Sequence, residues 1–155
     1  ENAQRVTQLL NKTNQFNLTT RRHTASEIQN MLLDDKVKIF AYREADRFGD
    51  NGIIAVVVVD LKNEIPVISE FVMSCRVMGK NIENAIIDDV EEYLQNKGFA
   101  GAKGEFIPTA KNKPVANLYS NLGYTESCSD GEHKIYEIRF SEKPARNYIL
   151  EKVIL

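Results

Sequence analysis

An unbroken apolar run, Ile53 to Val59, constrains the fold of this chain more than any other feature. Most of its residues are β-branched, which favours a strand, and a strand without polar positions is covered on both faces. The run is far too short to cross a bilayer as a helix. We therefore expect a buried central strand over Ile53 to Leu61.

Two neighbouring segments fit beside this strand as an antiparallel meander. Val37 to Ala45 alternates apolar and polar residues, as a strand does when one face is covered. Gly49 to Gly52 is rich in turn-forming residues, and the pair Asn63 and Glu64 forms a second turn. Ile65 to Cys75 is then the third strand.

Helical spacing occurs on either side of the meander. The clearest amphipathic helix runs from about Asn81 to Lys97. A capping box of Thr24 and Glu27 predicts the start of another. The buried stripe of that helix is expected to be Ile28, Met31 and Leu32. The other expected elements are helices over Ala3 to Lys12 and Asn112 to Leu122, and strands over Phe16 to Thr20, Gly101 to Pro108, Lys134 to Phe140 and Tyr148 to Leu155. This order predicts a mixed α/β (α+β) fold.

Composition places the chain among globular domains. It has 155 residues, 43% apolar and 27% charged, enough for one domain with a real core. A net charge of −2 gives no general attraction to nucleic acid or to an anionic membrane. Two cysteines cannot build a disulfide framework, and two histidines do not favour a metal site, so we predict no metal. No signal peptide is visible, which predicts a cytoplasmic location.

Residues 74–81 join the third meander strand to the strongest helix and could bind an anion. A helix N-terminus leaves backbone N–H groups unpaired at its positive end. Gly79 lets a ligand approach the backbone closely, and Arg76 and Lys80 add positive charge. Such a junction suits a pyrophosphate. The alternative is that Gly79 is an ordinary turn glycine and that the charges are solvated.

A second pattern pairs Asn112 with Tyr119, seven residues later and on nearly the same face of a helix. Asn112 could cap the helix or bond a ligand amide. A phenol at Tyr119 could protonate a leaving thiolate. The alternative is that Asn112 is only a cap and that Tyr119 packs in the core.

Together these two patterns resemble the Gcn5-related N-acetyltransferases, the GNAT family. Arg76, Gly79 and Asn81 stand at the first, fourth and sixth positions of that family's loop. The later pattern is matched by Asn112, Leu118, Tyr119, Gly123 and Tyr124. The resemblance covers roughly residues 16–140 and implies a mixed, mainly antiparallel central sheet flanked by helices.

The resemblance also implies a cofactor, coenzyme A or acetyl-coenzyme A, or the phosphopantetheine of a carrier protein. The pyrophosphate would lie on the loop amides, and the pantetheine would run along the gap where two neighbouring strands diverge. The implied cofactor-binding residues are Arg76, Val77, Met78, Gly79, Lys80, Asn81 and Asn112. The implied proton donor is Tyr119.

Longer strings, covering nearly the whole chain, resemble the C-terminal half of FkbH-like proteins. They are residues 8–22, 46–50, 74–79 and 108–112. FkbH-like proteins join a haloacid-dehalogenase-type domain to a GNAT-like part. They are associated with glyceryl transfer from 1,3-bisphosphoglycerate to an acyl carrier protein, on the way to methoxymalonyl units. The implied partners are an acyl carrier protein and an N-terminal dehalogenase-type domain of the same polypeptide.

The dehalogenase-type part normally carries an Asp-x-Asp-x-Thr string, and this chain contains none. The first residue is Glu1 rather than Met. We therefore expect a single GNAT-like domain over residues 1–155, as a C-terminal piece of a longer protein without the phosphatase chemistry.

Cys75 and Glu70 are further candidates for catalysis. Cys75 lies beside an arginine and a helix N-terminus, which would favour its thiolate and let it carry an acyl group; the alternative is a buried structural cysteine. GNAT enzymes often place a carboxylate on this strand, so the resemblance implies Glu70 as a general base. His23 and His133 are expected at the surface, and the acidic run Asp88 to Glu92 on a solvated helix face.

Three functions stay open at this point. The first is an acyltransferase, in which a nucleophile attacks the thioester and Tyr119 protonates the departing thiolate. The second is a binding module without turnover, which presents a phosphopantetheine arm to another domain; its basic residues Arg21, Arg22, Arg76 and Lys80 would face an acidic carrier protein. The third is a structural domain that supports folding or dimerisation.

Overall fold

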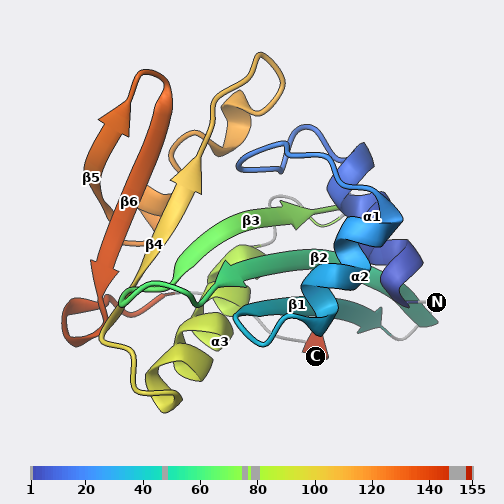
Figure 1. The fold of residues 1–155 in the computed structure, drawn as a ribbon, viewed down its shortest axis with the longest axis horizontal. Coiled ribbons are helices and arrows are strands. Elements are labelled where there is room, and N and C mark those ends of the chain that lie inside the picture. Colours follow the sequence, from blue (N-terminus) through green and yellow to red (C-terminus); the bar gives the residue numbers. More distant parts are fainter. Residues whose placement is uncertain (1, 47–48, 75–76, 78–80, 147–152, 155) are drawn as a thin grey trace.

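The computed structural model describes residues 2–46, 49–74, 77, 81–146 and 153–154, which form one sheet flanked by helices (Figure 1). The strands are β1 (Val37–Asp46), β2 (Gly49–Asp60), β3 (Val67–Met73), β4 (Gly101–Phe106), β5 (Thr125–Asp130), β6 (His133–Arg139) and β7 (Val153–Ile154). The helices are α1 (Asn2–Lys12), α2 (Ala25–Leu33), α3 (Ile82–Asn96) and α4 (Leu118–Asn121), with 3₁₀ turns at Lys113–Val115 and Phe140–Glu142. The strand order is β5-β6-β4-β3-β2-β1-β7. The predicted mixed α/β fold is confirmed.

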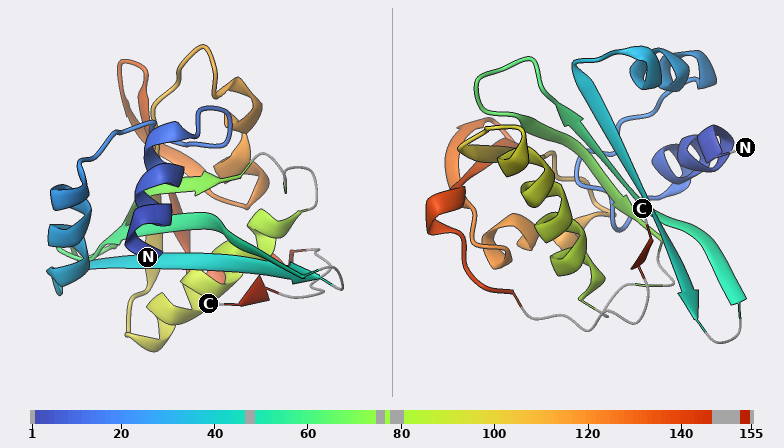
Figure 2. Two further views of the ribbon diagram at one scale, coloured as in Figure 1. Left: turned by 90° about the vertical axis from the view of Figure 1, so that its right-hand side faces the viewer. Right: turned by 90° about the horizontal axis from the view of Figure 1, so that it is seen from below.

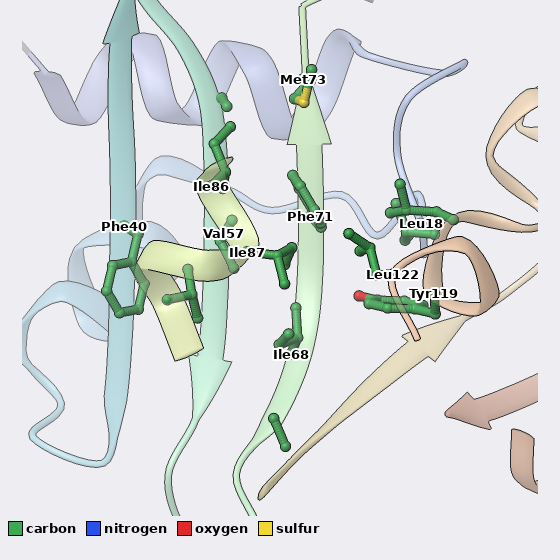
Figure 3. Close-up of a cluster of buried hydrophobic side chains, with 14 of the residues drawn as sticks. Leu18, Phe40, Val57, Ile68, Phe71, Met73, Ile86, Ile87, Tyr119 and Leu122 are labelled. Carbon is green, nitrogen blue, oxygen red and sulfur yellow. The ribbon is translucent and has the colours of Figure 1, made fainter. Parts of the chain in front are cut away.

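Helices cover both faces of the sheet, as Figure 2 shows. α1 and α2 pack on one face, where Leu10 and Ile28 are buried against Val56 and Val72 of the strands. α3 and α4 pack on the other face in a larger core. The residues that α3 and the meander bring together there include Phe40, Val57, Phe71, Ile86 and Ile87 (Figure 3).

β2 is the central buried strand that the apolar run predicts. Residues 53–59 are each at most 3% exposed, and they contribute to the cores on both faces. β2 pairs antiparallel with β1 on one side and with β3 on the other. The predicted three-stranded meander is therefore confirmed.

The predicted turn over Gly49 to Gly52 is wrong, because these residues belong to β2. The β1–β2 register shifts twice near this end, around Arg43. Gly52 lies between the shifted pairs and has a φ of 74°. A bulge needs such a left-handed residue as much as a turn does, so the same glycine is consistent with both structures.

Two elements near the C-terminus also differ from expectation. No strand is predicted over β5, where all six residues are exposed, so no apolar alternation marks it. The predicted helix from Asn112 to Leu122 is divided into the 3₁₀ turn at Lys113–Val115 and the four-residue helix α4. Backbone pairing with β6 forms β5 without the aid of a buried face.

The capping box of α2 is confirmed: the Thr24 side chain accepts from the Glu27 amide, and the Glu27 side chain accepts from the Thr24 amide. Ile28 is buried as predicted. Leu32, predicted to be buried with it, is 52% exposed. Ile28 is the buried residue of this helix and Met31 packs partly buried against the same core, so only part of the apolar stripe is covered.

The acidic run on α3 is not the solvated face that its sequence predicts. Glu91 is fully buried, and both its oxygens accept hydrogen bonds from Arg146, at 2.5 and 3.2 Å. The Tyr124 hydroxyl donates to Glu91 at 2.6 Å. Asp88 bonds Arg146 as well, and Asp89 accepts from the hydroxyl of a tyrosine on β1. The partners lie far along the chain, so local charge patterning did not reveal them.

We expect Arg146→Ala to lower the free energy of unfolding by about 3 kcal/mol, because it leaves the Glu91 carboxylate buried without its cation. Urea denaturation followed by circular dichroism measures the change. Arg139→Ala removes an exposed arginine from β6 and serves as the control, with an expected change below about 0.5 kcal/mol. Equal effects of the two substitutions would contradict this account of the cluster.

Candidate functional site

The candidate site lies where the neighbouring strands β3 and β4 diverge. These two strands run parallel and pair at Val67 with Lys103 and at Ile68 with Gly104, after which their pairing ends. A register shift on the other side of β3, at Val58 and Val59, marks a bulge at Ser69. A bulge increases local twist and turns a strand away from its neighbour. Beyond it, β3 presents backbone groups that β4 does not pair.

Residues 16–21, the bridging segment, lie in this divergence. Figure 1 shows the loop after α1 reaching the space between the ends of β3 and β4. Its backbone is bonded to β3 and to the residue after β4: the Leu18 amide donates to the Phe71 carbonyl at 3.1 Å, the Met73 amide to the Phe16 carbonyl at 3.0 Å, and the Ile107 amide to the Leu18 carbonyl at 2.8 Å. The strand predicted over Phe16 to Thr20 is thus reduced to one antiparallel bridge, between Asn17 and Val72.

Asn112 holds the bridging segment in place. Its amide nitrogen donates to the Asn17 carbonyl at 3.0 Å and to the Ile107 carbonyl at 2.9 Å. Its side-chain oxygen accepts from the Thr109 amide at 2.7 Å. The residue is fully buried. In this structure the whole amide group of Asn112 is therefore engaged inside the protein rather than open to a ligand.

Four charged side chains gather at the mouth of the divergence, and we call them the mouth cluster: Arg21, His23, Glu70 and Glu105. Arg21 forms two hydrogen bonds with Glu105, at 2.8 and 3.3 Å, and donates to the Ser69 carbonyl at 3.0 Å. The His23 Nε2 lies 2.6 Å from an oxygen of Glu70. A carboxylate on each of the divergent strands is thus paired with a residue at the end of the bridging segment or just after it.

His133 of β6 approaches the mouth cluster from outside, with its Nε2 2.7 Å from Glu105. Both histidines were expected at the surface. The His133 side chain is 37% exposed and fits that expectation in part, whereas the His23 side chain is only 15% exposed. The expectation for His23 is wrong because its partner, Glu70, lies 47 residues away and is itself buried.

Glu70 is placed where a carboxylate is costly to ionise. It is 3% exposed, and removal from water raises its pKa above the ordinary value. The hydrogen bond and charge of His23 and the charge of Arg21 act in the opposite direction, while Glu105 adds to the rise. Side chains alternate along a strand, so Glu70 faces the same side as Val72, toward α1 and α2.

Tyr119 lies on the other face of the sheet, in the core under α3 and α4 (Figure 3). Its ring packs against Gly104, where a Cβ would come within 2.4 Å of the ring, so only glycine fits there. The Tyr119 hydroxyl is buried and has no hydrogen-bond partner among the described residues. Burial, followed by the charge of Glu105, raises the pKa of this phenol, which therefore keeps its proton at neutral pH.

The predicted anion-binding loop lies mostly outside the described residues: this holds for Cys75, Arg76, Met78, Gly79 and Lys80. Their assignments stay predictions. Val77 is buried, and Asn81 stands before α3 with a left-handed φ of 59° and no capping bond from its side chain. α3 begins there with 15 residues, so its N-terminal amides lie next to the predicted loop.

A cavity of about 390 Å³ lies beside Ser74, the residue that enters the predicted loop. Arg5 and Lys12 of α1 line it together with polar side chains of residues 13–15. Within the described ranges, no group of three or more His, Cys, Asp or Glu residues could hold a metal ion, and no helix is long and apolar enough to cross a membrane.

Comparison with solved structures identifies the fold. The PaiA N-acetyltransferase of Thermoplasma acidophilum, solved in complex with coenzyme A, has 13% identity and a TM-score of 0.64 over 76% of this chain and 72% of that chain. A putative GNAT-family acetyltransferase of Desulfovibrio desulfuricans has 14% identity and a TM-score of 0.68 over 88% and 91%. An N-acetyltransferase of Staphylococcus aureus Mu50 has 15% identity and a TM-score of 0.64 over 89% of both chains. The chain has the GNAT acetyltransferase fold.

Comparison of the amino-acid sequence with known families and curated proteins gives no further identification. No protein-family model and no curated protein matches the chain. The fold is therefore established by structural likeness alone, and the finer resemblance to FkbH-like proteins rests on the sequence strings quoted above.

We expect Asn112→Ala to loosen the bridging segment, because the Asn17 and Ile107 carbonyls lose their shared donor. The free energy of unfolding should fall by about 1–3 kcal/mol. Hydrogen exchange should accelerate at the Leu18 and Ile107 amides. Asn117→Ala is the control, since Asn117 is exposed and its side chain makes no capping bond. Unchanged exchange at both amides would show that Asn112 does not hold the segment.

The raised pKa of Glu70 predicts a pH dependence of stability. Between its unfolded value of about 4.5 and the higher folded value, the folded state binds more protons than the unfolded state. Wild-type stability should therefore decrease, relative to Glu70→Gln, as the pH rises through 4.5 and above the folded pKa. Urea denaturation of both proteins between pH 4 and 7 measures the difference. A relative gain by wild type over that range would mean that His23 outweighs burial.

Proposed function

We propose that this chain binds the phosphopantetheine arm of coenzyme A or of a carrier protein and transfers the acyl group held on its thiol. The observation that carries the proposal is the divergence of β3 and β4, which brings a protonated phenol from one face and a histidine–carboxylate pair from the other to the same pair of strands. The GNAT fold and the coenzyme A complex of the PaiA neighbour support it.

The phosphates of the arm would lie on the backbone amides of residues 76–81, before the N-terminus of α3. The positive end of a helix of this length favours an anion. Arg5 and Lys12 line the cavity beside Ser74 and add positive charge near the entry to these residues. These positions support coenzyme A or acetyl-coenzyme A as the cofactor.

The remainder of the arm would enter the divergence, where an extended chain of amides can pair with free strand edges. In this structure the bridging segment makes those bonds. The arm and the bridging segment therefore compete for the same backbone groups of β3, and the segment withdraws when the arm is bound.

The chemistry is transfer of an acyl group between nucleophiles. The acceptor attacks the thioester carbonyl, the carbon–sulfur bond breaks, and the thiolate takes the phenolic proton of Tyr119. The unpartnered hydroxyl of Tyr119 is available for this purpose, since no described residue accepts its proton. Cys75 is an additional candidate acceptor, which would hold the acyl group as a second thioester.

We further propose that the reaction belongs to glyceryl- or methoxymalonyl-acyl carrier protein biosynthesis. The strings over residues 8–22, 46–50, 74–79 and 108–112 support this context through their resemblance to FkbH-like proteins. The partners would be an acyl carrier protein and an N-terminal dehalogenase-type domain. The thioester would then be presented by the carrier protein rather than by free coenzyme A.

One observation favours the second candidate function, a module that holds the arm without turnover. The bridging segment fills the divergence, and Asn112 is fully engaged in retaining it. Arg22, expected at a carrier-protein surface, is exposed and also bonds the Leu10 carbonyl at 2.8 Å. A protein closed in this way would hold an arm by its phosphates at the α3 N-terminus and release no thiol.

The test combines binding with thiol release. Coenzyme A at 100 times its dissociation constant should stabilise the protein by about 2.7 kcal/mol in thermal unfolding. Acetyl-coenzyme A, with water as the acceptor, should release free thiol. Tyr119→Phe should keep the binding and lower thiol release by about 100-fold, because it removes only the proton donor.

Tyr136→Phe is the matched control, since its ring packs 5.8 Å from that of Tyr119. It should leave thiol release unchanged. Stabilisation without thiol release would establish the binding module. No response to coenzyme A or to the phosphopantetheinyl carrier protein would overturn the proposal in favour of a structural domain.

A further inference from the structure

We propose that His23 is the proton acceptor for the group that attacks the thioester, and that Glu70 positions and stabilises it. The inference rests on the proposed function and names the base in that reaction. The acceptor X–H loses its proton to the His23 ring as X attacks the thioester carbonyl. The thiolate takes a proton from Tyr119, and both side chains exchange protons with water afterwards, which restores them.

The contact between His23 and Glu70 gives the ring a fixed direction. Nε2 lies 2.6 Å from Glu70 Oε1, and we assign to this nitrogen the proton that the carboxylate accepts. Nδ1 is then the basic nitrogen, and it has no hydrogen-bond partner among the described residues. A carboxylate behind an imidazole, with the opposite ring nitrogen free, is the arrangement by which proteins orient a general base.

The backbone of His23 is held as firmly as its ring. The His23 amide donates to the Asn11 side-chain oxygen at 2.7 Å, and its carbonyl accepts from the Asn11 amide nitrogen at 2.6 Å. This two-point contact ties the residue to the end of α1. A base positioned at both its backbone and its ring needs little reorganisation when the acceptor arrives.

Exposure favours His23 over Glu70 as the group that meets the acceptor. Glu70 is 3% exposed and its oxygen is covered by the ring, whereas the His23 side chain keeps 15% of its surface open. An acceptor arriving from solvent therefore reaches the imidazole first. The role of base that the resemblance implies for Glu70 is therefore shared by two residues: His23 accepts the proton, and Glu70 supplies the compensating negative charge.

The second histidine–carboxylate pair differs in a way that makes it a control. His133 shares Glu105 with Arg21, whose guanidinium already neutralises that carboxylate through two hydrogen bonds. Its side chain is 37% exposed. His133 therefore lies on a carboxylate that has another partner, whereas His23 is the direct hydrogen-bond partner of the buried Glu70.

The charged groups that face this pair set the expected pH profile. They are Arg21 and Glu105 beside Glu70, and Glu27 of α2 near His23. Thiol release should rise with pH and level off, as in a reaction that needs a proton acceptor. Glu70→Gln removes the negative charge that balances the proton taken up by the ring, so the plateau should fall.

The experiment measures thiol release from acetyl-coenzyme A, with water as the acceptor, in His23→Gln, His23→Ala, Glu70→Gln and His133→Gln. Glutamine can still donate a hydrogen bond to Glu70 but cannot accept the proton of the acceptor. The rate of thiol release should therefore fall by about 100-fold or more in His23→Gln. His133→Gln should stay within about 3-fold of wild type. Added imidazole should restore part of the rate to His23→Ala, which a purely structural role for His23 does not predict.

Stabilisation by coenzyme A is measured on the same variants and separates the two proposals. If coenzyme A does not stabilise the wild-type protein, the proposed function is wrong. Two results would overturn the role of His23 while coenzyme A still stabilises the protein. One is that wild type releases no thiol. The other is that His23→Gln leaves the rate and the pH profile of thiol release unchanged. If His23→Gln does not fold, the imidazole rescue of His23→Ala and the lower plateau rate of Glu70→Gln decide the question.

Discussion

The structure depends on hydrogen-bond partners for the backbone groups of β3 where the parallel strands β3 and β4 diverge. β3 is buried on both faces, so its amides and carbonyls beyond the bulge cannot turn to water and must find partners in the protein. The bridging segment supplies them, and Thr19 and Arg21 cover the carbonyl of Ser69 at the bulge itself. A requirement of hydrogen bonding thus fixes the path of the chain between α1 and α2.

That path also assembles the chemistry. Because the bridging segment is held between β3 and β4, its last residue and those that follow lie on the α1 side of the sheet. Arg21 meets Glu105 and His23 meets Glu70 there, although each pair is separated by at least 47 positions in the sequence. The candidate catalytic groups are therefore brought together by the same bonds that complete the sheet, while the two bonds between His23 and Asn11 hold His23 independently of the segment.

Local patterns in the sequence predict the elements whose signal is local. The apolar run at β2, the amphipathic helix α3 and the capping box of Thr24 and Glu27 all lie where expected. Glu70 and Tyr119 were identified as candidate site residues from the resemblance and the spacing, but His23 was not. Its role depends on a partner brought close only by the fold, and the same reason hid the contact of Glu91 with Arg146.

The bridging segment finally sets a limit on affinity. If each of its three backbone bonds to the divergent strands contributes about 1 kcal/mol, the open form lies about 3 kcal/mol above the closed one, a population near one in 150. An arm that binds only the open form then shows an apparent dissociation constant larger than its intrinsic one by the same factor. Free coenzyme A would meet this penalty in full. Under the proposed function, a carrier protein that touched the surface around the segment would have additional contacts with which to offset it. The closed sheet would then discriminate between a free thioester and one delivered by its carrier.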